Sequence, residues 1–129
     1  MKIFISGPMT GLEDYNIKEF DAAELLLREA GWTVFNPVNN GVDQSAPRSE
    51  HMHADLTMLL QCDIIYSLYH WDQSIGATLE FLTAKNLGMN QILQDKSREV
   101  PTPHNYLIED IYYKIIYQEI HRYRLITLK

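Results

Sequence analysis

The segment DIIYSLYHWDQSIGATLEFLTAKNLGMNQIL, residues 63–93, predicts a strand, a helix and a second strand in succession. Asp63–Leu68 is short and rich in β-branched and aromatic residues, which is typical of a buried strand. Ser74–Leu87 is long enough for a helix and is followed by Gly88, a common helix stop. Asn90–Leu93 predicts the second strand. This order predicts a βαβ unit with parallel strands.

The same alternation extends toward the N-terminus. Lys2–Ser6 and Trp32–Phe35 predict two further strands. A helix with Asn16 as its N-cap is expected between them, and another helix is expected over Ser49–Gln61. The chain is therefore expected to form an α/β fold, a doubly wound parallel sheet of four to five strands. Helices would cover both of its faces, as in Rossmann and flavodoxin-like proteins.

The composition predicts one domain over residues 1–129, with a helical C-terminal extension at about 105–129. There are 17 acidic and 11 basic residues, a formal charge of −6, which argues against binding a nucleic acid polymer. The single cysteine, Cys62, excludes an internal disulfide and fits a reducing, cytoplasmic compartment. No apolar run approaches the roughly 18 residues of a membrane span.

Ligands of doubly wound folds bind beyond the carboxyl ends of the strands, so the loops that follow the strands are candidate sites. In the loop after the first strand, glycines would let backbone N–H groups approach an anion. The spacing matches neither the dinucleotide fingerprint nor the P-loop, and a simple tight turn stays an alternative. The candidate binding residues of this loop are Ser6, Gly7, Met9 and Gly11.

Glu80 lies within an otherwise apolar predicted helix. Gly76, Ala77 and Ala84 share its helix face, and such small residues would leave a hollow in which a sugar ring could lie. The alternative is that Glu80 belongs to a solvent-facing stripe and the small residues are helix formers or close-packing contacts.

The helix before the third strand carries Asp55, which either reaches the strand ends or remains a solvated helix charge. His51 and His53 are two residues apart and would point away from each other on a helix. Cys62 has no histidine near it in the sequence and is interpreted as a small buried hydrophobic residue. Neither a metal site nor a cofactor is therefore expected.

Four segments carry a resemblance to a known family. They are IFISGPMTG (3–11), GWTVFNP (31–37), Ala54–Leu56 with Cys62–Asp63, and WDQSIGATLE (71–80). In these segments the chain resembles the nucleoside 2-deoxyribosyltransferase-like superfamily. It most closely resembles the small phage and prophage branch, which mostly lacks an assigned function. The most specific part is the Ser-x-Gly-x-x-x-Glu pattern over residues 74–80.

The resemblance implies a helix glutamate that attacks the anomeric carbon of a nucleoside or nucleotide and forms a glycosyl-enzyme ester. Glu80 matches this nucleophile, which must be ionised to attack. The dipole of the helix N-terminus about a turn away is expected to favour that charge. Asp55 matches the aspartate that contacts the nucleobase and helps to protonate it. Burial or the Glu80 charge would raise the pKa of Asp55 and keep it neutral.

Ser74 stands where the resemblance implies an aspartate for a sugar 5′-hydroxyl in the transferases and a serine for a 5′-phosphate in the nucleotide hydrolases. An aspartate would repel a phosphate, whereas a serine and N–H groups at a helix start would hold one. The loop from Ser6 to Gly11 is expected to complete the phosphate site, and Gly76 is expected to be a substrate-binding residue. Trp71, Tyr69 and Met9 are expected as pocket walls that stack on a base.

Phe4 departs from the family, which carries a tyrosine here whose hydroxyl orients the nucleophile. Tyr15, Tyr66 and Tyr69 are the candidate replacements. Phe4 also favours one alternative, a nucleotide-binding or sequestering module that has lost turnover.

The sequence predicts an enzyme that cleaves the N-glycosidic bond of a (deoxy)nucleoside 5′-monophosphate and releases the free base. The other alternative is 2-deoxyribosyl transfer between bases. The expected partners are a small nucleotide or nucleoside and, from the family, further copies of the chain in a homo-oligomer. No membrane partner is expected.

Overall fold

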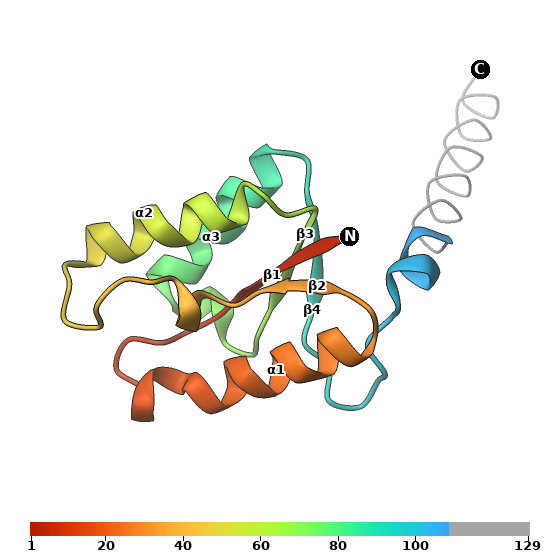
Figure 1. The fold of residues 1–129 in the computed structure, drawn as a ribbon, viewed down its shortest axis with the longest axis horizontal. Coiled ribbons are helices and arrows are strands. Elements are labelled where there is room, and N and C mark those ends of the chain that lie inside the picture. Colours follow the sequence, from red (N-terminus) through yellow and green to blue (C-terminus); the bar gives the residue numbers. More distant parts are fainter. Residues whose placement is uncertain (109–129) are drawn as a thin grey trace, which may run out of the picture.

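The computed structural model describes residues 1–108 (Figure 1). One sheet of four parallel strands has the order β2-β1-β3-β4. The strands are β1 (Lys2–Ser6), β2 (Thr33–Phe35), β3 (Ile64–Ser67) and β4 (Asn90–Leu93). The helices are α1 (Ile17–Glu29), α2 (Arg48–Leu59) and α3 (Ile75–Asn86), with 3-10 turns η1 (Glu13–Asn16), η2 (Pro37–Asn39) and η3 (Trp71–Gln73). The predicted parallel α/β fold is confirmed.

The connections place α1 on one face of the sheet and α2 and α3 on the other (Figure 1). The chain steps from β1 to β2 in one direction, and then from β2 past β1 to β3 and β4 in the opposite direction. Because β-helix-β crossovers are right-handed, this reversal puts the helices on opposite faces. The strands β1 and β3 are neighbours in the sheet, and the connections that follow them run to opposite faces. Ligands of such folds bind at this point, beyond the carboxyl ends of the two strands.

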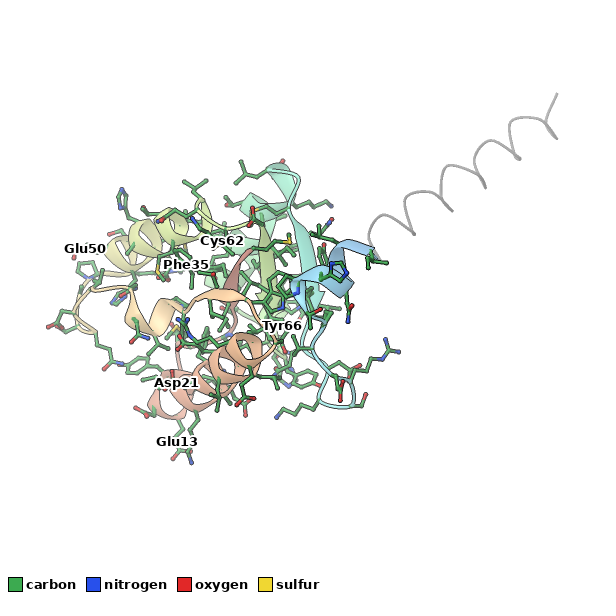
Figure 2. All side chains as sticks on the ribbon, turned by 45° about the vertical axis from the view of Figure 1, so that its right-hand side comes forward. Glu13, Asp21, Phe35, Glu50, Cys62 and Tyr66 are labelled. Carbon is green, nitrogen blue, oxygen red and sulfur yellow. The ribbon has the colours of Figure 1, made fainter. Side chains whose placement is uncertain are left out.

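Alternating strand residues divide the core into two halves. Ile5 and Tyr66 belong to the half that packs against α1. Phe4 and Phe35 belong to the half beneath α2 and α3. Figure 2 shows Tyr66 toward α1 and Phe35 toward α2. Since side chains of a strand alternate between faces, Ser6 lies on the same face as Phe4, at the carboxyl end of β1.

The first helix, α1, begins at the expected residue. Asn16 occupies the N-cap position, but its side chain makes no capping bond. Its Nδ2 instead donates to the Pro8 carbonyl oxygen at 3.0 Å. Asp14, Tyr15 and Asn16 all have positive φ angles, from 47° to 62°. The prediction of Asn16 as the N-cap is therefore confirmed by position, and its side chain links the start of α1 to the loop after β1.

The segment after β4 returns to the amino-terminal edge of the sheet. Trp32 Nε1 donates to the Pro101 carbonyl oxygen at 2.7 Å, and its ring lies edge-on to Tyr106 with centroids 5.9 Å apart. Residues 103–108 are helical. The rest of the helical extension predicted at about 105–129 lies outside the described residues.

Gly7→Ala is expected to lower the free energy of unfolding by about 1–3 kcal/mol. A Cβ at Gly7 would lie 2.8 Å from Leu68 Cβ and 2.9 Å from Leu68 Cδ1. A Cβ cannot rotate away, so the ends of β1 and β3 would have to separate. Urea unfolding measures the loss. Gly76→Ala is the control, since the nearest atom there, Met52 Cε, is 3.7 Å away. Equal stability of the two variants would contradict this explanation.

Candidate active site

Glu80 is a buried residue of α3, with 5% of its surface exposed. The helix begins at Ser74, whose Oγ accepts a hydrogen bond from the Ala77 N–H at 3.2 Å. Glu80 faces the sheet from the first half of this helix. The alternative that placed it on a solvent-facing stripe is therefore wrong. A carboxyl group in this position needs a hydrogen-bond partner, because unpaired buried polar groups are costly.

Ser6 provides that partner from the end of β1. Its Oγ donates to Glu80 Oε1 at 2.7 Å. In the register of β1 and β3, Ser6 lies opposite Ser67, another serine that is 1% exposed. Ser67 Oγ accepts a hydrogen bond from Gln91 Nε2 at 2.9 Å. Two buried hydroxyls therefore stand on adjacent strands, and Ser6 is the one bonded to the carboxyl group.

The small residues near Glu80 do not all have the expected role. Ala77 and Ala84 are each 1% exposed and pack tightly, so for these two the close-packing alternative is correct. A Cβ at Gly76 would meet Met52 Cε at 3.7 Å and Ser74 Oγ at 4.0 Å, both ordinary contact distances. Room for an added group is therefore found at Gly76, near the start of α3.

Burial dominates the electrostatics of Glu80 and raises the pKa of its carboxyl group to about 8. The Ser6 hydrogen bond lowers this pKa, and the charge of Asp55 raises it. Glu80 is the sixth residue of α3, and the effect of a helix dipole falls off beyond the first turn. The helix dipole that was expected to favour the Glu80 charge is therefore weak at this position, and burial is the main influence on the pKa of the carboxyl group.

Asp55 lies on α2, half-buried, and its Oδ1 accepts a hydrogen bond from Asn40 Nδ2 at 2.9 Å. Burial raises the pKa of this carboxyl group, while the Asn40 bond and the charge of His51 lower it. The alternative of a freely solvated charge is therefore wrong. The expected upward shift is present, and burial is its cause.

Asn40 and His51 extend the site, and neither is predicted from the sequence. Asn40 Oδ1 accepts a hydrogen bond from the Val42 N–H at 3.0 Å. This bond fixes the orientation of the amide, so that Nδ2 donates to Asp55. The same Nδ2 lies 3.2 Å from His51 Nδ1. The four-residue spacing of His51 and Asp55 places both on one face of α2, and this signal was available in the sequence. Asn40 lies in an irregular loop, where no pattern distinguishes it.

The other residues predicted from the loop after β1 occupy separate environments. Gly7 is buried against Leu68. Met9 is half-buried and packs against the α1 half of the core. Gly11 is exposed, with φ of 82°, a conformation that favours glycine. Ser6 is the residue of this loop that contacts Glu80.

The predicted aromatic walls have partners within the protein. The ring of Trp71 packs on Phe81 of α3, with centroids 4.7 Å apart. Tyr69 is 43% exposed. Its N–H donates to Gln94 Oε1, and its hydroxyl accepts the Lys96 N–H, each at 2.9 Å. Tyr69 is thus held against the segment that follows β4.

Phe4 is fully buried, and the hydroxyl that meets the glutamate comes from Ser6, two residues later on the same face of β1. Tyr66 lies on the α1 face of the sheet and cannot reach that carboxyl group. The Tyr69 hydroxyl bonds the segment after β4. Tyr15 is 44% exposed in the loop before α1. None of the three candidate tyrosines therefore bonds Glu80 in the described part of the chain.

Across residues 1–108, no three His, Cys, Asp or Glu side chains are grouped so that they could hold a metal ion. Within the same range, no helix combines the length and apolar character needed to span a membrane. Cys62 is half-buried and its thiol donates to the Met58 carbonyl oxygen at 3.4 Å. Burial raises the pKa of this thiol to about 12, which makes it a weak nucleophile.

These features define a parallel α/β domain with a buried glutamate at the carboxyl edge of its sheet. Residues 1–93 match the family described as Domain of unknown function (DUF4406). The chain belongs to this family. The matched range contains all four strands as well as Ser6, Asp55 and Glu80. No curated protein matches the chain.

The structure is similar to that of a 2-deoxyribosyltransferase from the psychrotolerant bacterium Bacillus psychrosaccharolyticus. The two chains are 27% identical, with a TM-score of 0.58. The match covers 72% of this chain and 71% of the other. This similarity supports the expected place of the chain in the nucleoside 2-deoxyribosyltransferase-like superfamily.

Glu80→Gln is expected to stabilise the protein progressively as the pH rises from about 5 to about 8. The pKa of Glu80 is about 8 in the folded protein against an ordinary value of 4.5, so the unfolded chain releases this proton first. The wild-type free energy of unfolding therefore falls across this window. Glutamine does not titrate, and its Oε1 can still accept the Ser6 bond. Urea unfolding at several pH values should show a gain of a few kcal/mol, at about 1.4 kcal/mol per pKa unit.

Glu29→Gln, at an exposed position at the end of α1, is the matched control for the same chemical change. Its effect on the free energy of unfolding should stay small throughout the window. If the two variants responded to pH alike, the conclusion that burial raises the pKa of Glu80 would be contradicted.

Proposed function

We propose that this protein cleaves the N-glycosidic bond of a (deoxy)nucleoside 5′-monophosphate and releases the free base, with Glu80 as the nucleophile. The supporting observation is the buried Glu80 carboxyl group, held by Ser6 at the carboxyl edge of a sheet similar to that of a 2-deoxyribosyltransferase. A fixed carboxylate can attack an anomeric carbon, as one does in retaining glycosidases.

In the first step, an oxygen of the Glu80 carboxylate forms a bond to C1′ while the bond from C1′ to the base nitrogen breaks. The electron pair of the broken bond goes to the base, and a proton from Asp55 neutralises it. Asn40 bonds Asp55 Oδ1, so Oδ2 is the oxygen that carries this proton. The products are a glycosyl ester on Glu80 and the free base.

In the second step, a water molecule attacks C1′ of the ester and gives a proton to the Asp55 carboxylate. The bond between C1′ and the glutamate oxygen breaks, and Glu80 leaves as a carboxylate. Both side chains return to their starting forms. The complete cycle consumes one water molecule for each glycosidic bond.

The reactive form of the pair has one proton, carried by Asp55. Burial raises the pKa of both carboxyl groups, so the pair retains a proton at a pH where solvated carboxyl groups would have none. A Glu80 pKa of about 8 keeps this proton mainly on Glu80. Transfer of the proton to Asp55 generates the nucleophile and the acid together.

We assign the 5′-phosphate to the start of α3, where Ser74 and Gly76 lie. The first N–H groups of a helix carry a partial positive charge and favour an anion. Ser74 Oγ accepts the Ala77 N–H, which leaves the proton of the hydroxyl to donate to a phosphate oxygen. Because Gly76 has no side chain, a phosphate can approach the Ser74 hydroxyl and the first N–H groups of α3.

The similarity to a 2-deoxyribosyltransferase favours a second function, transfer of a 2-deoxyribosyl group between bases. The first step is the same in both reactions. In the transfer, a second base takes the place of water and forms the new bond to C1′. The two functions therefore differ in the acceptor alone.

Incubation with each common ribo- and deoxyribonucleoside 5′-monophosphate, followed by chromatography, should reveal release of a free base. Glu80→Gln should reduce this release by several orders of magnitude, since the variant lacks the nucleophile. The variant should still bind, which thermal stabilisation by the same nucleotides would detect.

Each other result has a definite meaning. Unchanged release by Glu80→Gln would contradict the assignment of the nucleophile. Turnover that requires an added free base would identify transfer. Thermal stabilisation without turnover would identify a nucleotide-binding module.

Ser74→Asp should weaken the use of a monophosphate relative to the nucleoside by roughly 10- to 100-fold in kcat/KM. Aspartate is also a good N-cap, so α3 should keep its start while a negative charge faces the phosphate. Ser74→Asn is the matched control, because it has the same shape without the charge. An equal loss in both variants would contradict charge repulsion as the cause.

A further inference from the structure

The contact between Ser6 and Glu80 is a buried hydrogen bond of ordinary length. The two oxygens lie 2.7 Å apart, a typical distance for a hydroxyl donor. Ser6 is 1% exposed and Glu80 is 5% exposed, so water competes little for either group. A hydrogen bond to an ionised acceptor is stronger in such surroundings than in water.

The sheet fixes the position of Ser6. Ser6 pairs with Ser67 in the register of β1 and β3, and its carbonyl oxygen accepts the Leu68 N–H at 2.8 Å. The next residue, Gly7, is closely packed against Leu68. The hydroxyl therefore starts from a rigid strand end and not from a mobile loop. Donors held in this way orient a functional group most accurately.

A serine hydroxyl has one proton, and in this structure Glu80 Oε1 receives it. We infer that Ser6 is a positioning residue for Glu80: its hydroxyl holds Oε1 and presents Oε2 to the anomeric carbon. The inference rests on the proposed function, since it assigns a role to Ser6 within that reaction. It gives Ser6 a different role from the predicted one, in which Ser6 is a substrate-binding residue of the loop after β1.

The bond affects the charge as well as the orientation of Glu80. Burial opposes ionisation of this carboxyl group, whereas the Ser6 bond favours it. From α2, Asp55 acts on Glu80 and is itself influenced by His51. On the same face, β3 and β4 carry the uncharged Ser67 and Gln91, and Asp72 of η3 is exposed. Among these groups, Ser6 is the one that lowers the pKa of Glu80 and so favours the carboxylate.

Ser6→Ala removes this bond, and Ser67→Ala is its matched control. Both serines are 1% exposed, occupy paired strand positions and lose one hydroxyl hydrogen bond, but Ser67 is bonded to Gln91. Ser6→Thr keeps a hydroxyl and tests rescue. Comparable unfolding curves for Ser6→Ala and Ser67→Ala would show that general destabilisation is similar in the two.

Two measurements are made on these variants. The first is titration of the Glu80 carboxyl carbon by NMR, assigned from the signal that Glu80→Gln lacks. Ser6→Ala should raise the midpoint by about one pH unit, and Ser67→Ala should leave it near the wild-type value. The second is base release: Ser6→Ala should lower kcat roughly 10- to 100-fold with little change in KM. Its activity should also begin at a higher pH, and Ser6→Thr should recover part of kcat.

A midpoint and a kcat in Ser6→Ala equal to those of Ser67→Ala would overturn the role of Ser6. A raised KM with an unchanged kcat would also overturn it, because Ser6 would then bind substrate. If the wild-type protein releases no base, the proposed reaction fails. In that case the titration still decides whether Ser6 controls the Glu80 carboxyl group.

Discussion

The hydrogen bond between Ser6 and Glu80 joins the end of β1 to α3 across 74 residues of sequence. An unpaired carboxyl group between helix and sheet would be costly, so α3 can turn Glu80 inward only where a strand offers a donor. The register that buries Phe4 beneath α2 and α3 also places Ser6 on that face. A slip of β1 by one residue would direct Ser6 toward α1 and leave Glu80 without its partner. The core and the candidate site therefore depend on the same strand register.

Burial at this position works against stability and in favour of chemistry. A carboxyl group with a pKa near 8 destabilises the fold once it ionises, because the low-dielectric surroundings oppose the charge. The same surroundings exclude water and strengthen the interactions that a charged intermediate would make. Asp55 and Asn40 form a second such arrangement on the side of α2, where burial also raises the pKa of a carboxyl group. Two carboxyl groups that together retain one proton at neutral pH are suited to acid–base chemistry.

Local sequence patterns were sufficient for the fold but only partly sufficient for the site. The bounds of the four strands and of α1, α2 and α3 fall within two residues of the predictions, because β-branched runs and helical periodicity depend on neighbours in the chain. Glu80 and Asp55 could be singled out by residue type and resemblance. The partner of Glu80 could not, since a bond between residues 6 and 80 depends on strand order and on which face each side chain takes. Asn40 was missed for a similar reason, because tertiary packing alone brings its loop to α2.

Helix α3 carries both ends of the proposed site, and this explains why the identity of Ser74 is informative. At about 1.5 Å of rise per residue, the six positions from Ser74 to Glu80 fix a separation of roughly 9 Å along the helix axis. No loop motion can alter this distance between the anion-favouring helix start and the carboxyl group. The cap position itself accepts serine, aspartate or asparagine with similar stability, so the fold leaves the choice among them open. Helix stability therefore does not require serine over aspartate here, whereas the proposed binding of a 5′-phosphate does, because an aspartate would repel the phosphate.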